Sequence, residues 1–181
     1  GRIERLQSPN DLVLESLTVQ TPDRSRVLIR NLSLVVPQGD HLMIVGSSGS
    51  GKSSLLRAVA GLWQAGSGRI FCPGLSDIMF LPQQPYLQAG KLRDQLLYPH
   101  RHLNVCDEDL LHLLIRVRLA HLAAQPADLQ TARDWDRILS VGEQQRLAFA
   151  RVLLHRPLFT VLDEATSALD VSVQAQVLEV V

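Results

Sequence analysis

Two stretches of the sequence carry residue types that suit a phosphate group and a divalent cation. The first, GSSGSGKS (Gly46 to Ser53), fits a phosphate-loop pattern, with Gly46, Gly51, Lys52 and Ser53 at the required positions. Glycines let successive N–H groups point at phosphate oxygens, and the next helix adds its positive end. Lys52 would contact the β- and γ-phosphates, and the Ser53 hydroxyl would bind Mg²⁺. The alternative is a flexible serine–glycine turn, but the strand and helix expected around the motif favour the phosphate loop.

The second stretch, LDEATSALD (Leu162 to Asp170), places two carboxylates side by side after an apolar run. Asp163 and Glu164 repel each other unless a cation or a proton lies between them. Beside a phosphate loop, Asp163 is placed to hold Mg²⁺ through water. Glu164 points the other way along an extended backbone and can face the water that attacks the γ-phosphate. The alternative is that both residues only cap a loop or a helix.

A third stretch, LSVGEQQR, predicts the start of a helix. Ser140 followed by Glu143 has capping-box spacing, apolar residues recur at helical intervals, and Pro157 ends the pattern. We therefore expect a helix from about Val141 to His155. A glycine at a capped helix start is a second anion site, too far along the chain to belong to the first loop.

These stretches are positioned by short apolar runs that alternate with helical patterns. Strands are expected at Leu12–Val19, Val27–Val36, His41–Val45, Ile78–Pro82 and Leu158–Leu162. The first two resemble an antiparallel lead-in, and the third suits a strand covered on both faces. Helices are expected after the phosphate loop, from Asp107 to about Gln125, and again from Val171, with a polar connection at about residues 123–134.

Composition limits the class of protein. A chain of 181 residues with 46% apolar content can bury one core. Eighteen basic residues balance eighteen acidic ones, so charge does not predict a nucleic-acid partner. No apolar run approaches the roughly 18 to 20 residues that span a bilayer, and the first ten residues have no signal-peptide core.

The order and spacing of these motifs resemble the ATP-binding cassette family from about Leu12 to the end of the chain. LSVGE, beginning at Leu139, looks like its signature motif, and LPQQP and SALD look like its Q-loop and D-loop. The resemblance implies an α/β fold: a P-loop NTPase core with a mostly parallel sheet, an antiparallel β lead-in subdomain, and a helical subdomain at about 85–156. Residues 12–181 would be the cassette, with its C-terminal part missing, and residues 1–11 a linker from a preceding membrane domain.

By the same resemblance, two cassettes pair head to tail around ATP and Mg²⁺. The signature residues Ser140, Val141, Gly142 and Glu143 would act in trans on nucleotide held by the partner. Gln83 would sense Mg²⁺ and the attacking water, and Asp170 would communicate across the dimer. The expected catalytic residues are Glu164, Lys52 and Gln83, and the expected metal-binding residues are Ser53, Gln83 and Asp163. The expected nucleotide-binding residues are Gly46, Ser47, Ser48, Gly49, Ser50, Gly51, Lys52, Ser53, Ser54 and Val27.

Longer stretches around these motifs look like the subfamily D cassettes. They look closer still to bacterial fused permease–ATPase proteins described as vitamin B12, bleomycin or antimicrobial peptide transporters. Such a resemblance implies an ATP hydrolase that powers transport. Its partners would be a second cassette, most simply an identical one, and a permease domain in the same polypeptide, with no nucleic acid. The cassette would lie at the cytoplasmic face of a membrane, most simply the bacterial inner membrane.

The sequence departs from the family pattern in three places. Thr21 stands where an aromatic ring usually stacks on adenine, so adenine affinity would depend on aliphatic contact from Val27 and on the phosphates. Val141 replaces the first glycine of the signature, while Gly142 is kept. No histidine follows Asp170 to serve as the family's switch histidine. We therefore expect a fragment of a longer protein that hydrolyses ATP poorly by itself.

Two other classes of function use a phosphate loop. A soluble cassette acting on DNA would carry a long coiled coil between phosphate loop and signature, and ribosomal cassettes come as tandem pairs. Residues 53–139 hold no sustained heptads, and the chain has one cassette. A small-molecule kinase would leave LSVGEQQR without a purpose. The transporter motor is therefore the favoured hypothesis.

Overall fold

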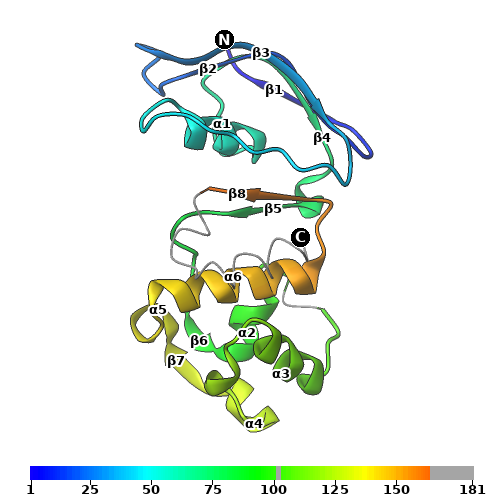
Figure 1. Ribbon diagram of the computed structural model, residues 1–181, viewed down its shortest axis with the longest axis vertical. Helices are drawn as coiled ribbons and strands as arrows, with labels where there is room; N and C mark the ends of the chain where they lie inside the picture. The colour runs from blue at the N-terminus through cyan, green and yellow to red at the C-terminus, as the bar shows by residue number, and fades with distance from the viewer. Residues whose placement is uncertain (101–102, 164–181) are drawn as a thin grey trace. The chain divides into compact units, whose positions relative to one another are not determined.

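The chain forms two compact units. The computed structural model describes residues 1–100 and 103–163 (Figure 1). Unit 1 consists of Gly1–Phe80 with Pro157–Asp163, and unit 2 has Leu81–Arg156 as its described part. Sheets and helices both contribute, which confirms the α/β class. No helix in the described ranges has the length and apolarity needed to cross a membrane.

Unit 1 contains a four-stranded sheet in the order β1-β4-β2-β3. Its strands are β1 (Glu4–Gln7), β2 (Leu12–Gln20), β3 (Val27–Val36) and β4 (Gly66–Cys72). β2 runs antiparallel to both β3 and β4, with Leu14 opposite Leu34 on one side and Ile70 on the other. β1 runs parallel to β4. The antiparallel lead-in expected for the first two apolar runs is thus confirmed.

One face of this sheet packs on helix α1 (Lys52–Val59). Leu17 and Val19 of β2 and Ile70 of β4 are fully buried, and they share a core with Leu55 of α1 and Val161. Figure 1 shows α1 between this sheet and the pair of strands β5 (Ile78–Leu81) and β8 (Phe159–Leu162). Both strands were expected from their apolar runs. Helix α1 is amphipathic: Leu55, Ala58 and Val59 are its buried residues, and Lys52, Ser53, Ser54 and Arg57 are its polar ones.

A close backbone approach fixes the register between β2 and β4. Gly68 has a φ of +95°, and a Cβ at this position would lie 2.5 Å from the Ser16 carbonyl oxygen. Ser16 itself has a φ of +48°, and the register shifts between Glu15 and Thr18. Glycine at residue 68 therefore lets the irregular part of β2 lie directly against β4.

Residues 1–11, which the resemblance assigned to a linker, contain regular structure. Glu4–Gln7 form β1, and Ile3 is buried in the core of unit 1. The Arg5 guanidinium donates to the Val59 carbonyl oxygen at 2.6 Å and to Cys72 Sγ at 2.9 Å. The strand reads ERLQ, which has no apolar periodicity, so nothing in the sequence pattern predicted it.

The strand predicted at His41–Val45 is wrong. None of these residues is assigned to a strand, and Met43 and Val45 are 85% and 80% exposed. A continuous apolar run indicates a buried strand only if a neighbouring strand edge pairs with it, and the run itself does not specify that neighbour. In the described part of unit 1, the paired strands are those of the four-stranded sheet and β5 with β8.

Unit 2 is mainly helical. Its elements are β6 (Ala89–Lys91), α2 (Leu92–Leu97), α3 (Asp107–Arg116), the 3₁₀ turn η2 (Ala120–Leu122), α4 (Pro126–Leu129), β7 (Ala132–Asp134), α5 (Trp135–Ile138) and α6 (Val141–His155). A second core lies among these elements and includes Leu96, Leu114, Trp135 and Leu147. The predicted helix Val141–His155 is confirmed.

Two predictions in unit 2 are corrected. The helix expected to reach Gln125 ends at Arg116, because Arg118 adopts a left-handed φ of +57° that a helix cannot continue through. The connection expected at about residues 123–134 contains α4 and β7. Asp128 accepts the N–H groups of Ala124 and Gln125 and so caps α4. Neither of these two elements contains an apolar run, and three or four residues are too few to show a periodicity.

Candidate functional site

The phosphate loop leads directly into α1. Gly51 is the N-cap residue with a φ of +95°, and a Cβ there would lie 3.1 Å from Leu28 Cβ of β3. No side chain caps this helix start. The N–H groups of the first turn therefore lack a side-chain acceptor at the cap, which is the arrangement that binds phosphate at a helix N-terminus.

Lys52 extends back over the loop. Its ammonium donates to the carbonyl oxygens of Gly46 at 2.7 Å and Ser47 at 2.8 Å. Gly46, Ser47, Ser48 and Gly49 are exposed, while Ser50, Gly51, Lys52, Ser53 and Ser54 are half-buried. The first part of the loop is thus accessible to solvent. The Lys52 ammonium already lies against the loop backbone.

Ser53 and Asp163 meet beside this loop although 110 residues separate them. The Ser53 hydroxyl donates to Asp163 Oδ1 at 2.7 Å, and Asp163 is only 7% exposed. β8 ends at Leu162, so the strand delivers this carboxylate to the first turn of α1. A hydroxyl and a carboxylate are the oxygen ligands that Mg²⁺ prefers, and the ion keeps several waters when few protein ligands are present. The residues present therefore fit Mg²⁺.

The start of β3 also lies at the loop, since Leu28 contacts the Gly51 position. Val27 is half-buried and pairs with Gln20 across the sheet. The hydroxyl of Thr21 donates to Asp23 at 2.5 Å and so stabilises the turn that precedes β3. This hydrogen bond is the main reason that the pKa of Asp23 is lowered to about 2. The role of Val27 toward adenine stays a prediction.

The signature segment belongs to unit 2 and forms the N-terminus of α6. Ser140 and Glu143 form the expected capping box: Glu143 Oε2 accepts the Ser140 N–H at 2.8 Å and the Ser140 hydroxyl at 2.7 Å. These bonds, the one from the hydroxyl first, lower the pKa of Glu143. Val141 is exposed and Gly142 half-buried on the first turn. The signature therefore presents a serine, a glycine backbone and an ionised carboxylate.

Gln83 is exposed and connects to the same helix. Its carbonyl oxygen accepts from Gln145 Nε2 of α6 at 3.3 Å. The segment that carries Gln83 is thus tied to the signature helix inside unit 2. Its role at the metal stays a prediction. Glu164 and Asp170 lie outside the described residues, and so does the helix expected from Val171.

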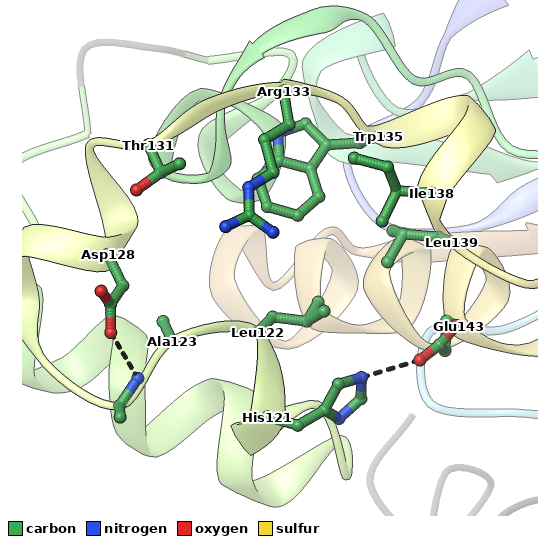
Figure 2. Close-up of a pocket in the computed structure, with 11 residues that line it drawn as sticks. His121, Leu122, Ala123, Asp128, Thr131, Arg133, Trp135, Ile138, Leu139 and Glu143 are labelled. Carbon is green, nitrogen blue, oxygen red and sulfur yellow. Dashed lines mark hydrogen bonds and ion pairs between the residues drawn. The ribbon is translucent and has the colours of Figure 1, made fainter.

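A cavity of about 460 Å³ lies beside the signature in unit 2 (Figure 2). It is lined by His121, Leu122, Ala123, Ala124, Asp128, Thr131, Arg133, Trp135, Ile138, Leu139 and Glu143. His121 Nε2 lies 2.8 Å from Glu143 Oε1 at its rim. The sequence pattern gave no reason to single out His121. Because His121 and Glu143 lie 22 residues apart in the chain, their spacing could not have predicted this contact.

Comparison with known proteins shows which family this chain matches. The model of the ABC transporter family matches residues 29–167. An uncharacterized ABC transporter ATP-binding protein of Synechocystis is 51% identical over 165 residues, which are 91% of this chain and 25% of that protein. ABC transporter D family member 2 of Arabidopsis thaliana, a chloroplastic protein, is 40% identical, covering 94% of this chain and 30% of its own length.

Two further matches agree. Human ATP-binding cassette sub-family D member 3 is 36% identical over 98% of this chain and 28% of its own length. A solved bacterial Atm1-family ABC exporter with ATP bound has a TM-score of 0.80 over 99% of this chain and 34% of that chain, at 24% identity, so it supports the fold.

This chain belongs to the ABC transporter family. Within it, the chain is similar to ATP-binding domains of subfamily D proteins, as its motifs indicated. It spans about a quarter to a third of the length of the curated relatives it matches. The residues matched by the family model include the phosphate loop, Asp163 and the signature.

Proposed function

We propose that this chain is the ATP-binding and ATP-hydrolysing motor domain of a membrane transporter. One observation carries the proposal: the Ser53 hydroxyl and the Asp163 carboxylate lie 2.7 Å apart at the end of a phosphate loop. The buried Asp163 carboxylate can accept more than the one hydrogen bond that the Ser53 hydroxyl donates, and a glycine-rich loop lies beside it. A triphosphate would accept from the N–H groups of that loop, and its metal ion would bind the carboxylate.

Bound Mg·ATP supplies a transferable γ-phosphoryl group. The backbone N–H groups of Gly46–Gly51 and the Lys52 ammonium would hold its phosphates, while Ser53 and Asp163 would hold the metal. Glu164 accepts a proton from the attacking water, which Gln83 helps to orient. Catalysis then consists mainly of positioning and of stabilising the charge that develops on the phosphoryl oxygens.

In the whole protein, two cassettes work together with a permease. The signature residues Ser140, Val141, Gly142 and Glu143 act in trans on nucleotide bound to a second copy of the cassette, and Asp170 lies at the dimer contact. The names of the matched relatives, which are ABC transporters, support a permease partner in the same polypeptide. Residues 1–11 then follow that permease domain, and the cassette works at the cytoplasmic face of a membrane, in a bacterium the inner one.

Replacement of Lys52 tests the proposal, since Lys52 and Lys91 are the two lysines of the chain. In the full-length protein, Lys52→Ala should weaken Mg·ATP binding by more than about a hundredfold, because charge-assisted bonds to the phosphates are lost. Lys91→Ala is the matched control, since Lys91 contacts Gln130 in unit 2. Titration calorimetry measures both. Normal affinity in Lys52→Ala, or equal losses in both variants, would contradict the phosphate-loop assignment.

A further inference from the structure

Three side chains form a continuous hydrogen-bonded series at the start of the signature helix. His121 of η2 contacts Glu143 Oε1 at 2.8 Å, and Glu143 Oε2 contacts the Ser140 hydroxyl at 2.7 Å. Figure 2 shows the imidazole directed at the Glu143 carboxylate across the rim of the cavity. The series therefore runs from an exposed loop of unit 2 to the signature serine.

The donors in this series can be assigned. An ionised carboxylate only accepts hydrogen bonds, and hydrogen bonds from Ser140 and then His121 lower the pKa of Glu143, so this residue is ionised at neutral pH. Nε2 of His121 must then carry a proton. The Ser140 hydroxyl has a single proton, and in this arrangement Glu143 accepts it.

Phosphate binding competes with the hydrogen bond from Ser140 to Glu143. Phosphate oxygens are acceptors, so Ser140 can donate its hydroxyl to a γ-phosphate only if that proton leaves Glu143. Glu143 must nevertheless stay in place, because it also accepts the Ser140 N–H at 2.8 Å and closes the capping box. A hydrogen-bond donor on the second oxygen of Glu143 meets both needs. It draws negative charge away from the oxygen that accepts from Ser140, and it fixes the orientation of the carboxylate.

Other charged groups around the cavity have partners of their own. Asp128 accepts the backbone N–H groups of Ala124 and Gln125, and the Arg133 guanidinium stacks over the Trp135 ring at 5.7 Å. Among the described residues, Glu143 is the acidic group in contact with His121.

We propose that His121 is a positioning residue for the ATPase reaction: through Glu143 it orients the signature hydroxyl of Ser140 for the γ-phosphate bound by the partner cassette. The inference rests on the proposed function and adds a residue to it. It predicts that loss of His121 weakens the closed, ATP-bound dimer without changing how one cassette binds nucleotide.

The test compares variants of the full-length protein. His121→Ala should lower kcat/KM for ATP by about tenfold, the effect of losing one charge-assisted positioning bond. Affinity for Mg·ADP should stay unchanged, because Mg·ADP binds to the phosphate loop alone. His121→Gln, which keeps a donor near the Nε2 position, should recover most of the activity. His112→Ala, an exposed histidine of α3, is the matched control.

A double-mutant cycle separates positioning from a structural role. In a Glu143→Gln background, His121→Ala should change kcat/KM by less than about twofold, because the group through which it acts has changed. An undiminished tenfold effect in that background, or wild-type kcat/KM in His121→Ala, overturns the inference while leaving the motor function in place. Absence of Mg·ATP turnover in the wild-type full-length protein overturns both.

Discussion

His155 lies at the C-terminal end of α6 with its ring half-buried. Nε2 lies 3.0 Å from the Tyr98 carbonyl oxygen, and the His100 ring packs edge-on at 5.3 Å. Burial, followed by the positive field of neighbours such as His100 and Arg151, lowers the pKa of His155, although the bond to Tyr98 opposes this. Folding therefore favours the neutral imidazole.

This preference predicts how stability depends on pH. Since the folded pKa lies below the unfolded value of about 6.5, the unfolded chain takes up the proton first as pH falls. The free energy of unfolding should therefore fall as pH drops below about 6.5 and level off below the folded pKa. Urea unfolding at a series of pH values should show a smaller fall for His155→Gln than for wild type. An identical profile for both would assign the pH dependence to other groups.

At the scale of elements, α6 holds unit 2 together through polar side chains that are buried. Gln144 donates to the carbonyl oxygens of Asp136 and Leu139, and Gln145 donates to that of Gln83. Arg151 donates to Gln95 O at 2.7 Å and to Tyr86 O at 2.9 Å. Each of these side chains donates to carbonyl groups that lie at a helix end or in a segment with little regular structure. Helix α6 therefore links the signature to the segment after Gln83.

Arg151 should be the most sensitive of these positions. Burial lowers its pKa to about 10, so the guanidinium is still charged at neutral pH, and it also lies over the Tyr98 ring at 5.0 Å. Arg151→Met should cost about 2–4 kcal/mol, because two carbonyl groups lose their donor. Arg137→Met, an exposed arginine of α5, should change stability little. Equal effects of the two substitutions in urea unfolding would show that the buried bonds contribute nothing specific.

At the scale of the whole molecule, the chain builds two cores and passes between them twice. Residues on both sides of unit 2 in the sequence, up to Phe80 and from Pro157, form unit 1. Leu17 and Ile70 are fully buried in one core, and Leu114 and Leu147 in the other. Each unit encloses its own apolar side chains.

Separate cores predict separate local stabilities. Leu17→Ala and Leu114→Ala each remove three carbon atoms from a fully buried site and should cost about 2–5 kcal/mol in the unit concerned. Hydrogen exchange followed by mass spectrometry should show faster exchange in β2 and β4 for the first variant. For the second, it should show faster exchange in α3 and α6. Uniform acceleration across both units in either variant would mean that the chain opens as one cooperative body.

The sequence by itself determined the elements whose signals are local. Three elements were predicted within a residue or two: β2, β3 and α6. Their periodicity and their ends can be recognised in the local sequence, for α6 from its capping box and the proline that follows it. The phosphate loop, the acidic strand end and the signature were also read from residue types at fixed spacing. These features lie within short windows, where backbone preference and side-chain pattern act together.

Only the tertiary structure decided what depends on contact between distant segments. It placed Ser53 against Asp163 across 110 residues and His121 against Glu143 across 22. It drew the polar stretch Glu4–Gln7 into a sheet and left the apolar run His41–Val45 without a strand partner among the described residues. A strand exists only when another edge supplies its hydrogen bonds, and two side chains form a site only when the fold brings them together, so neither outcome is written in a local pattern.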